Sequence, residues 1–316
     1  MTNQTDLLKR VRIALQTENY LDAIANLEKV VNIARDNDDV SAQGRHLGNL
    51  ALTYFRIGDI KQALKHFEDA LTCARSEQDR MMENGLLGNM GNVLREAGRY
   101  DDAIDRLNDA LLLAQELGDR RGRGIWLSNL GLVYDDLNRP KEAIPVHKSS
   151  VKVARQLYDN PSLATRLGNL GNAYVADNKY TEAIEQFKEA VTIYEQLGRK
   201  DEVALRVGII GNLYAEMGRA ILDSNQPQAY VHLNVALDYY GRAMTLMREL
   251  GDKASEAEVI RRIGNVLADA DQLEDATKYL NVAQQMFEAL GLQQQAEHSA
   301  TTLRRIIEFL ESDPSS

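Results

Sequence analysis

The stretch Leu167-Gly168-Asn169-Leu170-Gly171-Asn172-Ala173-Tyr174 decides the fold, because versions of it return along the chain. Earlier versions stand at 47–54, 87–94 and 127–134, and later ones stand at 207–214 and 260–267. The fifth place of each version holds a small residue, and these residues are Ala51, Gly91, Gly131, Gly171, Gly211 and Gly264. Neighbouring small residues are 40 positions apart, except for the last two, which are 53 apart. A fixed period of this size indicates a repeat protein.

A second pattern follows each of these segments with the same period. It reads Ala-x3-Phe-x2-Ala at 63–70, with close variants at 103–110, 183–190, 236–243 and 276–283. The copy at 23–30 is degenerate, and the copy at 143–150 carries His147 and Ser150 instead. Spacings of three and four place each set on one face of a helix. The small residues allow two helices to approach closely, and the large residues fill the space between them.

Each repeat is therefore predicted to be two helices joined by a tight turn. The turns carry residues that accept a left-handed backbone, namely Gly58, Gly98, Asn138, Asn178 and Gly218. Gly118, Gly198 and Gly251 mark the links between repeats, and Asp119 and Asp252 can cap the following helices. The predicted pairs are 4–17/20–36, 42–57/60–76, 82–97/100–117, 122–137/140–157, 162–177/180–197, 202–222/227–249 and 254–270/273–289. No segment alternates with period two, so no sheet is predicted.

The pattern Leu-x2-Leu/Met-Gly/Ala-x2-Tyr, followed by Ala-x3-Phe-x2-Ala, resembles the tetratricopeptide repeat. Its period of 40 residues is longer than the usual 34 of that family. The string at 167–174 is similar to the long-repeat group that contains the LGN/Pins adaptors, the kinesin light chains and many bacterial signalling proteins. No segment resembles the G-protein-binding motifs that follow the repeats in LGN.

The resemblance implies an all-α fold, a right-handed superhelical α-solenoid of seven helix-turn-helix units. A last helix at about 294–311 is expected to cap the final repeat, with Leu303, Ile306, Ile307 and Leu310 on its apolar stripe. We expect a single solenoid domain over residues 1–311. Residues 312–316 are expected to form a disordered tail.

Thirteen extra residues fall in the sixth helix pair, at about 202–249. They extend both helices by about two turns around a turn at 223–227. One hypothesis is a neutral elongation. The other is a second docking surface, formed by apolar residues that lack cover from a neighbouring repeat: Ile221, Leu222, Tyr230 and Val231.

In the tetratricopeptide family, residues that flank the packing positions of the first helix face a groove. The residues just after the repeated small residue include Asn92, Asn172, Asn212 and Asn265, and those two places before it include Asn49, Asn89, Asn129 and Asn169. A carboxamide donates and accepts hydrogen bonds, so a ladder of them can pair with the backbone of an extended peptide. In LGN-like and kinesin-light-chain-like repeats asparagines at these positions have this role, and the resemblance implies it here.

Packing against an adjacent helix or loop is the alternative role for the second of these two sets. Charged residues on the first helices also suggest a polarity of the groove. Arg45, Arg56 and Arg95 lie toward its N-terminal end, and Asp135 and Asp136 lie in its middle. A ligand with acidic groups toward the N-terminal half and basic groups toward the middle would match this pattern.

The composition excludes several classes of protein. The chain has 316 residues, of which 44% are hydrophobic, and a net charge of −10. An acidic chain does not fit nucleic-acid binding, which needs clustered bases. No apolar run is long enough to span a membrane, and the first ten residues lack the apolar segment of a secretory signal. With a single cysteine, these observations favour a cytoplasmic protein with no membrane contact.

No catalytic or cofactor-binding constellation is found in the sequence. No two of the five histidines, His46, His66, His147, His232 and His298, are two to four residues apart as in a metal-binding pair, so no metal site is expected. Cys73 is expected to be a buried small hydrophobe rather than a nucleophile. Gly122-Arg123-Gly124 follows a helix rather than a strand, so it is not a dinucleotide fingerprint. Trp126 is expected to pack against the preceding helix pair.

The function favoured by the sequence is a non-catalytic scaffold that holds a peptide or partner segment in its groove. The bound segment is an extended peptide or a helix. The second hypothesis is a bacterial regulatory sensor, in which a ligand changes the pitch of the superhelix and thereby the contact with an effector. Self-association through the terminal helices is a further possibility. An enzyme is disfavoured, because no acid–base or metal set converges.

Overall fold

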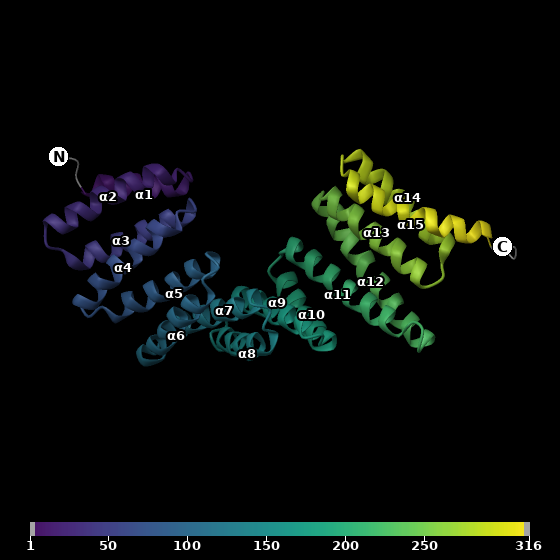
Figure 1. Cartoon of the computed structure of the whole chain (residues 1–316), viewed down its shortest axis with the longest axis horizontal. Helices are drawn as coiled ribbons and strands as arrows, with labels where there is room; N and C mark the ends of the chain where they lie inside the picture. The colour runs from purple at the N-terminus through teal and green to yellow at the C-terminus, as the bar shows by residue number, and fades with distance from the viewer. Residues whose placement is uncertain (1–3, 313–316) are drawn as a thin grey trace. The chain divides into compact units, whose positions relative to one another are not determined.

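The computed structural model describes residues 4–312, and within them it contains helices and turns but no strand (Figure 1). The helices of the first compact unit are α1 (Gln4–Gln16), α2 (Tyr20–Asp36), α3 (Val40–Arg56), α4 (Ile60–Ser76), α5 (Arg80–Glu96), α6 (Tyr100–Leu117), α7 (Arg120–Asp136) and α8 (Pro140–Gln156). Those of the second unit are α9 (Asn160–Ala176), α10 (Tyr180–Gln196), α11 (Lys200–Ile221), α12 (Gln226–Leu250), α13 (Lys253–Asp269), α14 (Leu273–Ala289) and α15 (Gln293–Ser312). The all-α repeat solenoid predicted from the sequence is confirmed. That it is one domain over 1–311 stays a prediction.

The first helix of most pairs begins earlier than the sequence analysis predicted, because an aspartate caps it. The side chain of Asp79 accepts a hydrogen bond from the Met82 backbone N–H (2.9 Å), so α5 starts at Arg80 rather than at 82. The equivalent caps are Asp39, Asp119, Asp159 and Asp252. Each cap satisfies one of the backbone donors that a helix start leaves free.

The repeated small residue of the first helix packs against the repeated large residue of the second. A Cβ at Gly91 would lie 2.6 Å from Leu107 Cγ, and one at Gly171 would lie 2.7 Å from the Phe187 ring. The same contact joins Gly211 to Tyr240 and Gly264 to Leu280, at 2.8 Å in both pairs. The large residues are buried, Phe187 and Leu107 fully. The two periodic patterns therefore specify one helix–helix contact, which recurs in both units.

The weakened fourth copy places an imidazole in this contact. His147 is fully buried, and a Cβ at Gly131 would lie 2.4 Å from its ring. Its Nε2 lies 2.8 Å from Asp135 Oδ2, and the Ser150 hydroxyl donates to the Gly124 carbonyl (3.0 Å). The imidazole and the hydroxyl that replace apolar groups here thus each make a hydrogen bond, while His147 Nδ1 is buried without one.

The turn glycines and asparagines have the expected left-handed backbone, with φ of 80° at Gly58 and 58° at Asn178. Gly218 is the exception, and its predicted place in a turn is wrong. It lies inside α11 and is buried, where a Cβ would come within 2.8 Å of Leu233 Cδ2. The glycine is needed because the long helices α11 and α12 approach closely at this point. These helices have 22 and 25 residues, whereas the other helices from α3 to α14 have 17 or 18.

Helix α15 packs on α14 and α13, as expected of a cap. Ile306 is buried and Leu303 and Leu310 are half-buried, but Ile307 is 40% exposed and does not belong to the packed stripe. The helix includes Ser312, which the sequence analysis assigned to a disordered tail. The rest of that tail lies outside the described residues.

A carboxylate joins the end of α12 to the start of α13. Glu256 is buried, and its two oxygens accept hydrogen bonds from Arg248 Nε (2.8 Å) and Lys253 Nζ (2.9 Å). These hydrogen bonds, first that of Lys253 and then that of Arg248, lower the pKa of Glu256. The ionised form therefore stabilises the link between the sixth and seventh helix pairs.

Replacing Glu256 with glutamine is expected to lower the free energy of unfolding by about 1 kcal/mol at pH 7. Because the folded pKa lies below the unfolded value of about 4.3, this stabilisation is present above that value and is lost as the pH falls through the folded pKa. The difference between wild type and variant, measured by urea denaturation, should therefore shrink from about pH 6 to about pH 3. Glu308→Gln, at an exposed site on α15, is the control. A difference that does not change with pH would contradict the assignment.

Candidate binding surface on the first helices

Two kinds of position carry the predicted groove asparagines, and they are counted here from the repeated small residue. Position −2 holds Asn49, Asn89, Asn129 and Asn169, and position +1 holds Asn92, Asn172, Asn212 and Asn265. Asn49 and Asn172 are exposed, and the other six are half-buried. The surface formed by these positions is called the first-helix face below. All eight side chains thus lie at the boundary between the helix packing and solvent.

A hollow of about 280 Å³ opens on the first-helix face of the first unit, between α3 and α5. It brings together three of the predicted residues, Arg45, Asn49 and Asn89. Its remaining lining is apolar or consists of glycine: Gly44, Gly48, Leu52, Met82, Gly85 and Leu86. We call it the α3–α5 hollow.

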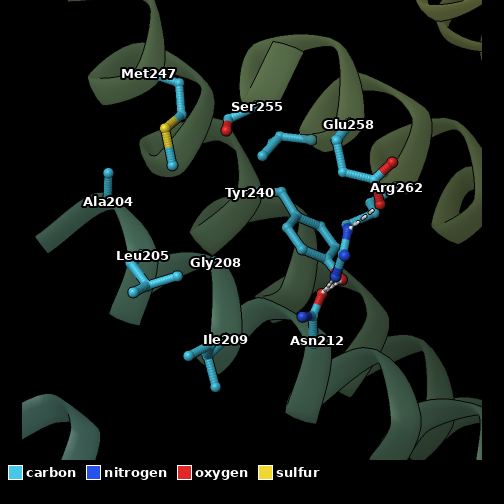
Figure 2. A pocket seen from close by; sticks show the side chains of 11 residues that line it. Ala204, Leu205, Gly208, Ile209, Asn212, Tyr240, Met247, Ser255, Glu258 and Arg262 are labelled. Atoms are coloured by element: carbon cyan, nitrogen blue, oxygen red, sulfur yellow. Dashed lines mark hydrogen bonds and ion pairs between the residues drawn. The ribbon is translucent and has the colours of Figure 1, made fainter. Parts of the chain in front are cut away.

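A second hollow, of about 180 Å³, opens on the first-helix face of the second unit, between α11 and α13 (Figure 2). Of the predicted residues it contains Asn212. The other lining residues are Ala204, Leu205, Gly208, Ile209, Tyr240, Met247, Ser255, Glu258, Val259 and Arg262. We call it the α11–α13 hollow.

The two hollows are built from the same repeat positions. The first of the two helices contributes positions −7, −6, −3, −2 and +1, and the next first helix contributes −9, −6, −5 and −2. Asn89 in one unit therefore corresponds to Arg262 in the other, and Leu86 corresponds to Val259. The hollow is a property of the repeat, and the residue types at these positions give each copy its own chemistry.

The amide of Asn212 is held in place at the edge of the α11–α13 hollow. Its Oδ1 accepts hydrogen bonds from Tyr240 Oη (2.7 Å) and from Arg262 Nη1. Figure 2 shows this oxygen directed at the Arg262 guanidinium, with the amide nitrogen on the other side. Burial raises the pKa of Tyr240, so its hydroxyl stays protonated as the donor.

Two arginines share one carboxylate at the same edge. Glu258 accepts hydrogen bonds from Arg261 Nη2 (2.7 Å) and Arg262 Nε (2.8 Å). Burial disfavours the charged form of Glu258, but these two arginines outweigh it and lower the pKa of the carboxyl. The three groups together carry one excess positive charge.

The equivalent space at two other junctions is filled by a large side chain. At Gly88 a Cβ would meet the Trp126 ring at 2.4 Å, and at Gly168 it would meet the Arg206 guanidinium at 3.2 Å. Trp126 is held there because its Nε1 donates to Asn84 Oδ1 (3.0 Å), so the prediction that it packs against the preceding pair is confirmed. At Gly208 a Cβ would meet nothing within 4 Å. At Gly48, in the α3–α5 hollow, a Cβ would meet Leu86 Cδ2 at 3.0 Å. Of these four junctions, the space directly above position −3 is therefore empty only above Gly208, where the residue at position −5 of the next first helix is Val259.

The charged residues predicted for the groove are partly paired with one another. Arg95 forms ion pairs with Glu96 and with Asp136 (3.6 Å), and Asp135 contacts His147 as described above. Arg45 donates to the Ser41 hydroxyl (2.7 Å), and both it and Arg56 are exposed. The positive end of the predicted polarity is thus carried by Arg45 and Arg56, and the polarity itself stays a prediction.

The remaining predicted residues line neither of the two hollows. Asn92, Asn129, Asn169 and Asn172 lie singly along their helices, and the Oδ1 of Asn265 is buried without a hydrogen-bond partner. In the extended pair Val231 is 53% exposed, while Ile221, Leu222 and Tyr230 are half-buried, so the second docking surface stays a prediction. The same holds for self-association through α1 and α15, which expose Ile13 and Phe309.

Two partners that complete the α11–α13 hollow, Tyr240 and Arg262, were not predicted from the sequence. Both stand at places with a recognisable signal. Arg262 occupies position −2, where four earlier repeats have asparagine, and Tyr240 places a hydroxyl where most other repeats have Phe or Leu. Residues that depart from a regular repeat pattern in this way indicate a function specific to that repeat.

Within residues 4–312, no cluster of three or more histidine, cysteine or acidic side chains is placed to hold a metal ion. None of the helices in this range is long and apolar enough to cross a membrane. Cys73 is buried, as predicted, and burial raises the pKa of its thiol.

These features define the class of the protein as an all-α repeat protein whose first helices carry two hollows. The family model described as tetratricopeptide repeat matches residues 4–76, 83–156 and 141–196. The chain belongs to the tetratricopeptide repeat family. No curated protein sequence matches it.

Solved structures share the fold at low sequence identity. BtubC (BKLC) from P. vanneervenii is 18% identical, with a TM-score of 0.60 over 78% of this chain and 92% of that one. A STAND signal-transduction ATPase with a tetratricopeptide repeat sensor, from Pyrococcus horikoshii, is 14% identical, with a TM-score of 0.66 over 98% of this chain and 50% of that one. A Rap protein complexed with Competence and Sporulation Factor is 16% identical, with a TM-score of 0.51 over 98% and 86%.

Proposed function

We propose that the chain is a non-catalytic scaffold that binds an extended segment of a partner protein along its first-helix face. The observation that carries the proposal is the recurrence of one hollow, built from the same nine positions, in both units. Each hollow combines apolar walls with amide and guanidinium groups, which suits apolar side chains and backbone of a bound segment. A protein partner is favoured over nucleic acid because the chain carries a net charge of −10.

The fold is compatible with this role and with a regulatory one. Tetratricopeptide repeats are typically interaction scaffolds, and the Rap protein noted above was solved with Competence and Sporulation Factor. A sensor of the kind in the STAND protein is the second candidate. A scaffold binds its partner without a change in the dimensions of the chain, whereas a sensor changes its radius of gyration when the ligand binds. Small-angle X-ray scattering with and without a selected peptide separates the two.

The proposal is tested by selecting binders from a displayed library of random peptides on the full chain. Changing Asn92, Asn172 and Asn212 together to alanine should weaken the selected peptides at least about tenfold, because each amide hydrogen bond contributes about 0.5–1.5 kcal/mol. Fluorescence anisotropy of labelled peptides measures the loss.

The matched control changes three exposed asparagines of second helices, Asn108, Asn234 and Asn281, to alanine. This variant should bind as the wild type does. Because Asn212 also holds Tyr240, the thermal midpoint of each variant is measured alongside. Equal binding by both triple variants would place the site elsewhere, and a library without enriched peptides would overturn the proposal.

A further inference from the structure

We propose that the α11–α13 hollow is a specificity pocket, which takes one apolar side chain of the partner segment with an acidic residue next to it. The inference rests on the proposed function of the first-helix face. It goes further because it assigns the chemistry of the bound segment at one named junction.

The size of the hollow limits the occupant to a single side chain. Its volume is about 180 Å³, close to the cavity of about 150 Å³ that holds one benzene molecule. Pockets for whole small-molecule ligands are larger, about 300–1,000 Å³. The walls made by Leu205, Ile209 and Val259 are apolar. A phenylalanine, leucine or methionine side chain therefore matches both the volume and the lining.

The polar edge of the α11–α13 hollow has free hydrogen-bond donors but few free hydrogen-bond acceptors. The Asn212 oxygen is occupied by Tyr240 and Arg262, so the free part of this amide is its NH₂ group, which can only donate. The oxygens of Glu258 are occupied by Arg261 and Arg262. A group that accepts hydrogen bonds is therefore preferred beside the apolar side chain, and one that only donates is not.

The charge at this edge favours an acidic acceptor. Arg261 and Arg262 face one carboxylate, Glu258, which leaves one positive charge unbalanced. Their side chains are 25% and 37% exposed, so neither is closed off from solvent. A carboxylate gains a charge-assisted hydrogen bond here, whereas an ammonium group is repelled.

Position −5 explains why this junction is open. Val259 is short and leaves the space above Gly208 empty, while Trp126 and Arg206 fill the equivalent spaces above Gly88 and Gly168. Val259 is thus the residue that sets the depth of the pocket. Trp126 shows what a closed junction looks like, because its indole at position −5 fills the equivalent space in an earlier repeat.

The test uses two capped dipeptides, N-acetyl-Phe-Glu-amide and N-acetyl-Phe-Lys-amide, with the full chain. Methyl NMR follows Leu205, Ile209 and Val259, and the titration gives the dissociation constant of each probe. The glutamate probe should shift these methyl resonances and bind about fivefold more tightly than the lysine probe, as a partly exposed charge pair allows. Equal affinity of the two probes would overturn the acidic assignment.

Gly208→Met places a flexible side chain in the hollow, at a position where a Cβ meets no atom within 4 Å. It should weaken the glutamate probe at least about tenfold, the effect of losing burial of one apolar side chain. The control is Gly241→Met on α12, where a Cβ also has open space and which does not line the hollow. Unchanged binding by Gly208→Met would show that the probe lies elsewhere and overturn the pocket.

Arg262→Gln keeps hydrogen-bonding capacity and removes the excess charge. The preference for the glutamate probe over the lysine probe should then disappear, while the shared phenylalanine still shifts the methyl groups. A preference that persists would overturn the role of Arg262.

The dipeptide results do not depend on the peptide selection. The dipeptides test the pocket even when the library yields no enriched peptide. Asparagine-dependent peptides that bind Gly208→Met normally would leave the proposed function standing and overturn the pocket alone.

Discussion

Phe187→Ala is expected to lower the free energy of unfolding by about 3–5 kcal/mol, the range for removing a buried aromatic ring. The side chain is fully buried on α10, where it fills the space left by Gly171 on α9. This loss of free energy has two parts, the transfer of the ring to water and the cavity that it leaves. The cavity remains because the helix backbones cannot close the gap. Urea denaturation followed by far-UV circular dichroism measures the change.

The matched control for this prediction is Phe309→Ala on α15, whose ring is 57% exposed. It removes the same atoms from a site where they bury little area, so the expected loss is below about 1 kcal/mol. Similar losses for the two variants would contradict the assignment of Phe187 to the repeating helix–helix contact.

Gly88→Ala and Gly208→Ala are expected to change stability in opposite directions, although both residues occupy position −3 of a first helix. The new methyl group at residue 88 would overlap the Trp126 ring, which the bond to Asn84 keeps in place. Overpacking costs about 1–3 kcal/mol, which is more than alanine gains over glycine in helix propensity. The free energy of unfolding of Gly88→Ala should therefore fall by about 1–2 kcal/mol. Gly208→Ala meets no atom and should gain about 0.5–1 kcal/mol, because alanine is the better helix former.

The fluorescence of Trp126, the only tryptophan of the chain, reports directly on the first of these variants. A displaced indole should emit at longer wavelength in Gly88→Ala and remain unchanged in Gly208→Ala. Urea denaturation supplies the sign of each stability change. Stabilisation by both substitutions would mean that Trp126 does not fill the junction above Gly88.

Most of the fold was predictable because it depends on short-range patterns repeated many times. The small residue at Gly171 and the large one at Phe187 are 16 positions apart, and the same interval recurs in most of the repeats. Each pair contains enough information to place its own two helices. Gly218 was wrongly predicted to lie in a turn. A glycine that ends a helix and one that lets a neighbouring helix approach closely look the same in a sequence.

The candidate site was predictable only in part, because the sequence indicated some residues that line the two hollows but not their partners. Repeat positions −2 and +1 identified Asn49, Asn89 and Asn212, which line the two hollows. The partners of Asn212 come from helices 28 and 50 residues further along the chain, so no local pattern indicated them. The sequence also did not show that Arg95 is paired. It forms an ion pair with Asp136 of the next first helix.

The sequence by itself determined the architecture of this protein, since a 40-residue period of small and large residues leaves one way to pack successive helices. The tertiary structure decided which junctions are open. Gly88 and Gly208 are equivalent in the repeat, yet one is covered by Trp126 and the other faces empty space beside Val259. The physical reason is that a repeat pattern fixes backbone spacing, whereas the space left between two backbones depends on the volume and hydrogen bonds of side chains from the next repeat.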